Sequence, residues 1–172
     1  FNVTTTLGGS TKVLIDEDAQ CFIVTYASRW RDTNPDVIDF SQVTGCDMEV
    51  RETRTELMRE NGEGEKESYN PPRYDIDYDM YLTIHVNSPY FDEITFKVND
   101  YRIEERYSIE FSEVERQAQE IRDTLTRMRE QARDAAIAAV TPKQAVTCPS
   151  CGATTTPDVH GCCEYCGGAI GD

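Results

Sequence analysis

Apolar and polar residues alternate in several short runs up to about residue 110, which is the period of a strand with one buried face. The clearest run is 80–86, where Met80, Leu82 and Ile84 are separated by Tyr81 and Thr83. The predicted strands are 12–15, 20–26, 37–40, 46–52, 80–86 and 93–98. Together they predict an antiparallel meander of about six to seven strands, with a hairpin around the acidic turn that precedes residue 20.

The segment 51–73 interrupts this pattern. It contains a run at 61–68 that is rich in glycine and charged residues, and it offers few apolar residues for burial. Ordering such a segment costs conformational entropy with little compensating burial, which favours a mobile loop. The alternative is an extended β-hairpin whose strands reach about Leu57 and Tyr74.

A long amphipathic helix is predicted over 112–140. Ser112 and Glu115 match a capping box at its start, and Pro142 ends it. An apolar stripe follows the capping box at spacings of three and four residues. Its members are Val114, Ala118, Ile121, Leu125, Met128, Ala132, Ala135 and Ala139.

The apolar stripe has two interpretations. Its larger residues can cover the sheet while the alanine-rich end forms a rigid spacer, because a rise of about 1.5 Å per residue gives a helix about 40 Å long. Alternatively, the stripe can serve as the seam of a coiled coil, and the chain would then be a homodimer through the helix 112–140.

The charge balance narrows the range of partners. The chain has 172 residues, with 17 lysines and arginines against 32 aspartates and glutamates, so its formal net charge is −15. An acidic chain repels nucleic acid phosphates unless a local basic patch opposes the global field, and the sequence shows no such patch. The composition therefore argues against a nucleic acid partner. No apolar run of about 18 residues occurs, so we expect no membrane span.

Cysteine usage indicates metal binding. The seven cysteines are residues 21, 46, 148, 151, 162, 163 and 166, and five of them lie within the last 25 residues. Such clustering is typical of metal ligation rather than of a disulfide framework, and we infer a reducing, cytoplasmic setting. Cys21 and Cys46 lie in strand-like runs and are expected to be small buried hydrophobes. With two histidines and no phosphate-binding glycine loop, the chain is not expected to be an enzyme.

Four of these cysteines form two C-x-x-C-G knuckles separated by eleven residues: Cys148, Cys151, Cys163 and Cys166. A C-x-x-C turn directs two thiolates at one cation, and two such turns supply a tetrahedral zinc site with Zn–S distances of about 2.3 Å. Four protein ligands leave no open position. The spacing therefore predicts one structural zinc ion (Zn2+) per chain rather than a catalytic one.

Other interpretations of the knuckles stay open. The same sulfurs can form two disulfides or hold iron. Cys162 can replace Cys163 as a ligand, and His160 can do so less well, although only Cys163 has the two-residue spacing to Cys166. Cys162 is therefore expected to be a surface thiol.

Three alternating aspartates resemble a second cation site. Asp75, Asp77 and Asp79 are spaced like the start of a calcium loop, but Met80 and Val86 stand where that loop requires Gly and Glu. We therefore expect these aspartates to form a solvated entry to a strand.

The tail resembles bacterial zinc-ribbon modules of pattern C-P-x-C-G-A followed by C-x-Y-C-G, over Cys148–Ile170. More loosely, Leu14–Glu17, Ile38–Val43 and the closing helix resemble a family of uncharacterised bacterial proteins that combine a PH-like domain with zinc ribbons. This resemblance implies a PH-like antiparallel sheet closed by a C-terminal helix. The chain lacks the ribbon before the sheet that such relatives often carry, and it lacks their glycine-rich insertion at 51–73.

We therefore expect an α+β chain in three parts: a PH-like antiparallel β domain over 1–111, a long helix over 112–140 and a zinc ribbon over 141–172. The expected function is that of a non-enzymatic protein-interaction or adaptor module with a structural zinc ion and an unknown protein partner. The first alternative is a nucleic-acid-binding or regulatory zinc-ribbon protein, and the second is an enzyme with an open metal or acidic site.

Overall fold

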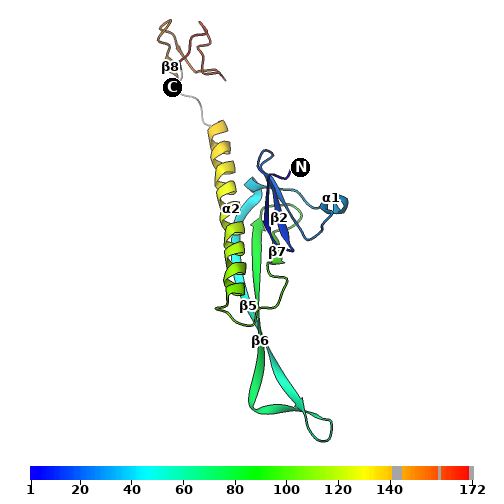
Figure 1. Ribbon diagram of the computed structural model, residues 1–172. Helices are drawn as coiled ribbons and strands as arrows, with labels where there is room; N and C mark the ends of the chain where they lie inside the picture. Colours follow the sequence, from blue (N-terminus) through cyan, green and yellow to red (C-terminus); the bar gives the residue numbers. More distant parts are fainter. Residues whose placement is uncertain (141–144, 159, 171–172) are drawn as a thin grey trace. The chain divides into compact units, whose positions relative to one another are not determined.

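The computed structural model describes residues 1–140, 145–158 and 160–170 (Figure 1). The chain forms two compact units, Phe1–Arg133 and Asp134–Asp172. The division between them falls within the long helix α2 (Ile109–Val140). The predicted α+β class, with antiparallel sheets, one long helix and a cysteine cluster after it, is confirmed.

The strands of the N-terminal unit divide between a four-stranded sheet, ordered β1-β2-β3-β4, and a three-stranded sheet, ordered β5-β6-β7. Every pairing in both sheets is antiparallel. The strands are β1 (Thr5–Gly8), β2 (Lys12–Asp16), β3 (Cys21–Thr25), β4 (Ile38–Asp39), β5 (Val43–Glu60), β6 (Lys66–Val86) and β7 (Glu93–Lys97). Two short helical segments, α1 (Trp30–Thr33) and η1 (Phe40–Gln42), lie between β3 and β5. The sequence pattern did not predict β1.

The segment 51–73 belongs to the ordered hairpin of β5 and β6, so the mobile-loop interpretation is wrong. The two strands pair from Val43 opposite Val86 to Glu60 opposite Lys66, with a register shift between Leu57 and Met58. Both strands extend well beyond the rest of the N-terminal unit as a two-stranded arm (Figure 1).

The arm is stabilised by polar contacts rather than by burial of apolar side chains. At its turn, the side-chain oxygen of Asn61 accepts hydrogen bonds from the N–H groups of Glu63 and Glu65, both at 2.9 Å. Across the strands, Arg59 forms an ion pair with Glu67 at 2.6 Å. Such cross-strand pairs and the backbone ladder stabilise a hairpin even where both of its faces are exposed.

One apolar core joins both sheets to α2. Phe22 and Phe40, from the first sheet and η1, stack with their ring centroids 5.4 Å apart. Met80, Leu82 and Ile84 of β6 belong to the same buried cluster, together with the apolar face of α2. The N-terminal unit therefore has a single core that lies between the two sheets and the helix.

The apolar stripe of α2 covers the sheets, as the first interpretation of the pattern requires. Its larger members from Val114 to Met128 are buried, Ala132 is half-buried against the core, and Ala135 and Ala139 are exposed. The face that a coiled coil would use between Val114 and Met128 is thus occupied within the chain.

The start of α2 differs from the prediction. The helix begins at Ile109, and the hydroxyl of Ser108 accepts a hydrogen bond from the N–H of Phe111 at 3.1 Å. Ser112 lies inside the first turns, where its hydroxyl donates to the carbonyl of Ser108. The capping box predicted at Ser112 and Glu115 is therefore wrong, because an earlier serine caps the helix.

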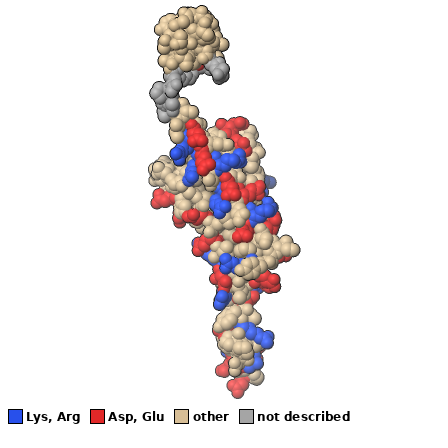
Figure 2. All heavy atoms as spheres, turned by 90° about the vertical axis from the view of Figure 1, so that its left-hand side faces the viewer, with Lys and Arg blue, Asp and Glu red and all other residues tan. Residues whose placement is uncertain are grey.

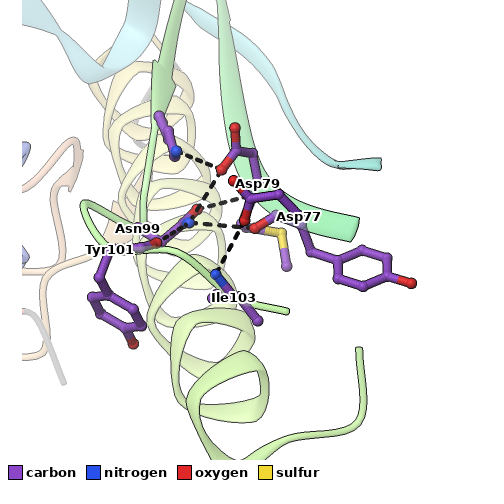
Figure 3. Close-up of polar contacts among 8 residues, drawn as sticks. Asp77, Asp79, Asn99, Tyr101 and Ile103 are labelled. Carbon is purple, nitrogen blue, oxygen red and sulfur yellow. Dashed lines mark hydrogen bonds and ion pairs between the residues drawn. The ribbon is translucent and has the colours of Figure 1, made fainter. Parts of the chain in front are cut away.

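The three alternating aspartates tie the chain after β7 to β6, and they are half-buried rather than solvated. Figure 3 shows two of them, Asp77 and Asp79. Asp77 accepts a hydrogen bond from the N–H of Ile103 at 3.2 Å, while Asp79 and Asp75 form ion pairs with Lys97 and Arg102. The carboxylates of these aspartates therefore bind protein groups from residues 97–103. The prediction that these aspartates form a solvated entry to a strand is therefore wrong, because they are half-buried and paired.

Asn99 is the buried centre of this cluster, with 3% of its surface exposed (Figure 3). Its side-chain oxygen accepts a hydrogen bond from the N–H of Met80 at 2.9 Å, and its amide donates to the carbonyl of Tyr101 at 2.8 Å. The same amide lies 3.4 Å from the carbonyl of Tyr78. Asn99 thus completes the hydrogen bonds of β6 where β7 ends.

We expect Leu125→Ala to lower the free energy of unfolding by about 2–5 kcal/mol, because Leu125 is fully buried between α2 and the sheets and its truncation leaves a cavity. Arg127→Ala, at an exposed position of the same helix, should change it by less than about 0.5 kcal/mol. Denaturant unfolding followed by circular dichroism measures both values. Equal effects would contradict the placement of the stripe.

We expect Asn99→Ala to lower the free energy of unfolding by about 1–3 kcal/mol, because it leaves the N–H of Met80 and the carbonyl of Tyr101 without their partner. Asn87→Ala, which truncates an exposed asparagine, serves as the control and should be nearly neutral. The same unfolding experiment compares the two variants. A neutral Asn99→Ala would show that solvent satisfies these groups.

Candidate metal centre

Beyond the end of α2, the described part of the C-terminal unit forms two short hairpins, and each carries one C-x-x-C-G knuckle. Strand β8 (Val146–Thr147) pairs with β9 (Thr154–Thr155) across the first knuckle. An isolated bridge between Cys162 and Ala169 closes the second. The sequence therefore places one pair of thiols at the turn of each hairpin.

Both knuckles have the same backbone hydrogen bonds. In the first, the N–H of Cys148 donates to the carbonyl of Ala153, and the N–H of Gly152 donates back to the carbonyl of Cys148, both at 2.8 Å. In the second, the N–H of Cys163 donates to the carbonyl of Gly168 and that of Gly167 to the carbonyl of Cys163, again at 2.8 Å. The two pairs of sulfurs are thus held by equivalent local structures.

Glycine is required at two kinds of position in these knuckles. Gly152 and Gly167 have φ angles of +74° and +72°, in the left-handed region that side chains disfavour. Gly168 permits a close approach instead, because a Cβ there would lie 2.9 Å from the hydroxyl oxygen of Ser150 and 3.4 Å from the sulfur of Cys166. Gly168 therefore lets one knuckle approach the other.

The four predicted cysteines come together as one group, whose sulfur atoms all lie within 4.8 Å of one another. The sulfurs of Cys148 and Cys166 are 3.6 Å apart, and those of Cys151 and Cys163 are 3.7 Å apart. A tetrahedron with metal–sulfur bonds of about 2.3 Å has edges of about 3.8 Å. A disulfide needs about 2.05 Å instead. The geometry therefore fits a single metal ion and does not fit the disulfide interpretation.

The electrostatics of the cluster also favour a cation. The N–H groups of Cys151 and Ser150 lower the pKa of the Cys148 thiol to about 6. The N–H of Gly168 has the largest single effect on the pKa of Cys166 and lowers it, but the thiols of Cys151, Cys148 and Cys163 and desolvation together raise this pKa to about 12. Four adjacent sulfurs cannot all carry negative charge unless a cation neutralises them.

Cys162 and His160 lie outside this group of sulfurs. The sulfur of Cys162 is 3.8 Å from the carbonyl oxygen of His160. The carboxylate of Asp158 accepts hydrogen bonds from the backbone N–H groups of both residues at 2.8 Å. This loop geometry fixes Cys162 next to the cluster without bringing its thiol into it.

The two remaining cysteines are structural. Cys21 is buried, and burial raises its pKa. Cys46 is half-buried against the core, and burial raises its pKa to about 11. Both thiols are therefore neutral at physiological pH and pack as small apolar groups. The prediction that both are buried is confirmed for Cys21, whereas Cys46 is only half-buried.

Comparison of the chain with protein-family models, with curated proteins and with solved structures finds no match in any of the three. In the part of the chain that the structure describes, no helix is both long enough and apolar enough to cross a membrane. Function is therefore inferred from the metal centre and the fold.

The adjacent substitutions Cys163→Ser and Cys162→Ser form a matched pair. We expect Cys163→Ser to lower metal affinity by more than about 100-fold, because it removes a sulfur from the cluster. Cys162→Ser should keep the full metal content. Elemental analysis of the purified chain measures both variants, and the reverse result would identify Cys162 as the ligand.

Proposed function

We propose that the chain is a non-enzymatic protein-interaction module whose C-terminal unit is a ribbon folded by one structural zinc ion. The observation that carries this proposal is the closed set of four sulfurs from Cys148, Cys151, Cys163 and Cys166. A coordination sphere filled by four protein ligands has no position for a substrate or a reactive water. The metal therefore supplies shape rather than chemistry.

Zinc is the metal that such a site favours. Sets of four thiolates from two C-x-x-C turns are typical of structural zinc sites, and iron is the competing ion for the same sulfurs. The unit also needs a metal for its stability. Among its described residues, the buried apolar ones are Cys148 and Cys163 themselves. A structural zinc ion contributes about 10–16 kcal/mol of apparent binding energy, which replaces the missing core.

A protein is the favoured partner on grounds of charge. The formal charge of −15 opposes nucleic acid phosphates, and Lys143 is the single basic residue between 141 and 172 other than His160. Reduced thiols in the cluster support a cytoplasmic setting. We also propose self-association through the part of α2 beyond Met128, where Ile137 is an exposed apolar residue.

A PH-like fold is proposed for the N-terminal unit. The support is its two antiparallel sheets of four and three strands, followed by a helix whose apolar face completes their core. Because one fold can host many unrelated functions, the PH-like fold indicates no particular activity, and we propose that it serves as a scaffold for docking.

Cobalt substitution tests the structural role of the metal. We expect the full chain with Co2+ in place of zinc to show the absorption spectrum of a tetrahedral four-thiolate site, and we expect added azide or cyanide to leave it unchanged because no coordination position is open. A spectral shift on adding either anion would reveal an open position and overturn the non-enzymatic assignment.

Nucleic acid binding is tested on the same protein. We expect fluorescence anisotropy with labelled DNA and RNA at low salt to show no association, because the acidic chain repels phosphates. Salt-dependent binding that Cys163→Ser abolishes and Cys162→Ser keeps would favour the nucleic-acid-binding alternative instead.

A further inference from the structure

A groove with a volume of about 360 Å³ lies between the edges of the two sheets of the N-terminal unit. One side is formed by Val24 of β3 together with Asp36 and Ile38 at β4. The residues of the other side belong to β7 and the turn before it, and they are Phe91, Glu93, Ile94 and Thr95. Its volume is in the range that small ligands and single side chains occupy.

The β7 side of the groove is a free strand edge. β7 pairs with β6 alone. The N–H of Val98 donates to the carbonyl of Met80, and the alternation of antiparallel ladders then directs the backbone groups of Phe96 and Ile94 toward β6. The N–H and C=O groups of Glu93 and Thr95 point away from β6. Within the described residues they have no backbone partner.

The opposite side of the groove is a second free edge. β4 has two residues and pairs with β3 at Cys21 and Phe22. The N–H of Phe40 donates to the carbonyl of Gln20, so Gln20 directs its backbone groups toward the β4 side of β3. Every second residue of an antiparallel strand faces the same neighbour, so Phe22, which is opposite Ile38, and then Val24 direct their backbone groups to that side as well. β4 ends before it reaches Val24. Free edges of this kind are sites where an extended chain can add a strand.

The side chains of the groove define the chemistry of its ligand. Val24, Phe91 and Ile94 are half-buried against the core and form an apolar floor. Asp36 and Glu93 are exposed at its rim, and neither forms an ion pair in the described part of the chain. An apolar floor with two unpaired carboxylates matches an extended segment in which apolar and basic residues alternate.

We infer that this groove binds an extended basic–apolar peptide segment of a partner protein, which adds as a strand to the free edge of β7. The inference rests on the proposed interaction function and names the class of its partner. A second copy of the chain is disfavoured as the occupant, because a symmetric contact here would bring two copies of Asp36 and Glu93 together in chains of net charge −15.

The inference is tested on the ¹⁵N-labelled full chain with two synthetic peptides. One alternates arginine and valine, and the other alternates glutamate and valine. We expect the first to bind at least about tenfold more tightly. It should slow hydrogen exchange at the amide of Thr95, whereas the amide of Phe96, which bonds to β6, should change little. Equal binding of both peptides, or binding without protection of Thr95, would overturn the inference.

Three variants localise the binding. Thr95→Pro removes an N–H that points away from β6, so it should weaken the arginine–valine peptide about tenfold or more while the β6–β7 ladder is kept. The double variant Asp36→Lys and Glu93→Lys should have a similar effect. Glu63→Lys also reverses a carboxylate charge, but at an exposed position of the turn between Glu60 and Lys66, and it should leave the affinity within about twofold. A loss from Glu63→Lys as large as that from the double variant would indicate a nonspecific charge effect and reject the groove.

The failure of this inference is distinguishable from a failure of the proposed function. Peptide binding by Cys163→Ser at unchanged affinity is expected, because the groove belongs to the N-terminal unit. A chain that holds one zinc ion but binds neither peptide would refute the groove and leave the ribbon assignment intact. A chain that binds the peptide but shows an open metal position would refute the non-enzymatic assignment alone. Dimer formation that Thr95→Pro abolishes would assign the edge to a second copy and reject the partner peptide.

Discussion

Attraction between the four clustered sulfurs and one cation is the interaction on which, in our proposal, the C-terminal unit depends. This unit buries almost no apolar surface besides two of its own ligands, Cys148 and Cys163, so hydrophobic burial cannot offset the entropy of ordering it. The backbone bonds of each knuckle position the thiols in advance, and left-handed glycines make those turns possible. The shape of the unit is then a consequence of coordination, and any surface that it offers to a partner exists through the metal.

The N-terminal unit is stabilised by different means. Its two sheets and α2 share one apolar core. On the face that Figure 2 shows, acidic and basic side chains are interspersed with uncharged ones. The polar cluster around Asn99 holds the chain beyond β7 against β6, which fixes where that sheet ends. Because β4 is also short, two strand edges face a common groove. The limits of the strands thus determine the binding geometry that we infer.

Features with a local cause were predictable from the sequence. The cysteine cluster follows from spacing within each knuckle, and the buried stripe from Val114 to Met128 follows from helical periodicity. Features that depend on register were not. The arm shows no strand period because both of its faces are polar, and its contacts, such as Arg59 with Glu67, join residues whose pairing the sequence does not reveal. The partners of Asp77 and Asp79, and the groove beside β7, arise only from the tertiary arrangement.

The exposed arm of β5 and β6 has a consequence for how this chain can vary in length. Its distal ladder contacts itself rather than the core, so its reach can change without repacking Leu82 or Ile84. Any such change must respect the twofold period of a strand, because an odd insertion would turn every following side chain to the opposite face. The register shift at Leu57 and Met58 marks one position where four residues of β6 without a partner, 69–72, are already absorbed. The arm therefore behaves as a spacer whose reach grows or shrinks in steps of residue pairs, added equally to both strands.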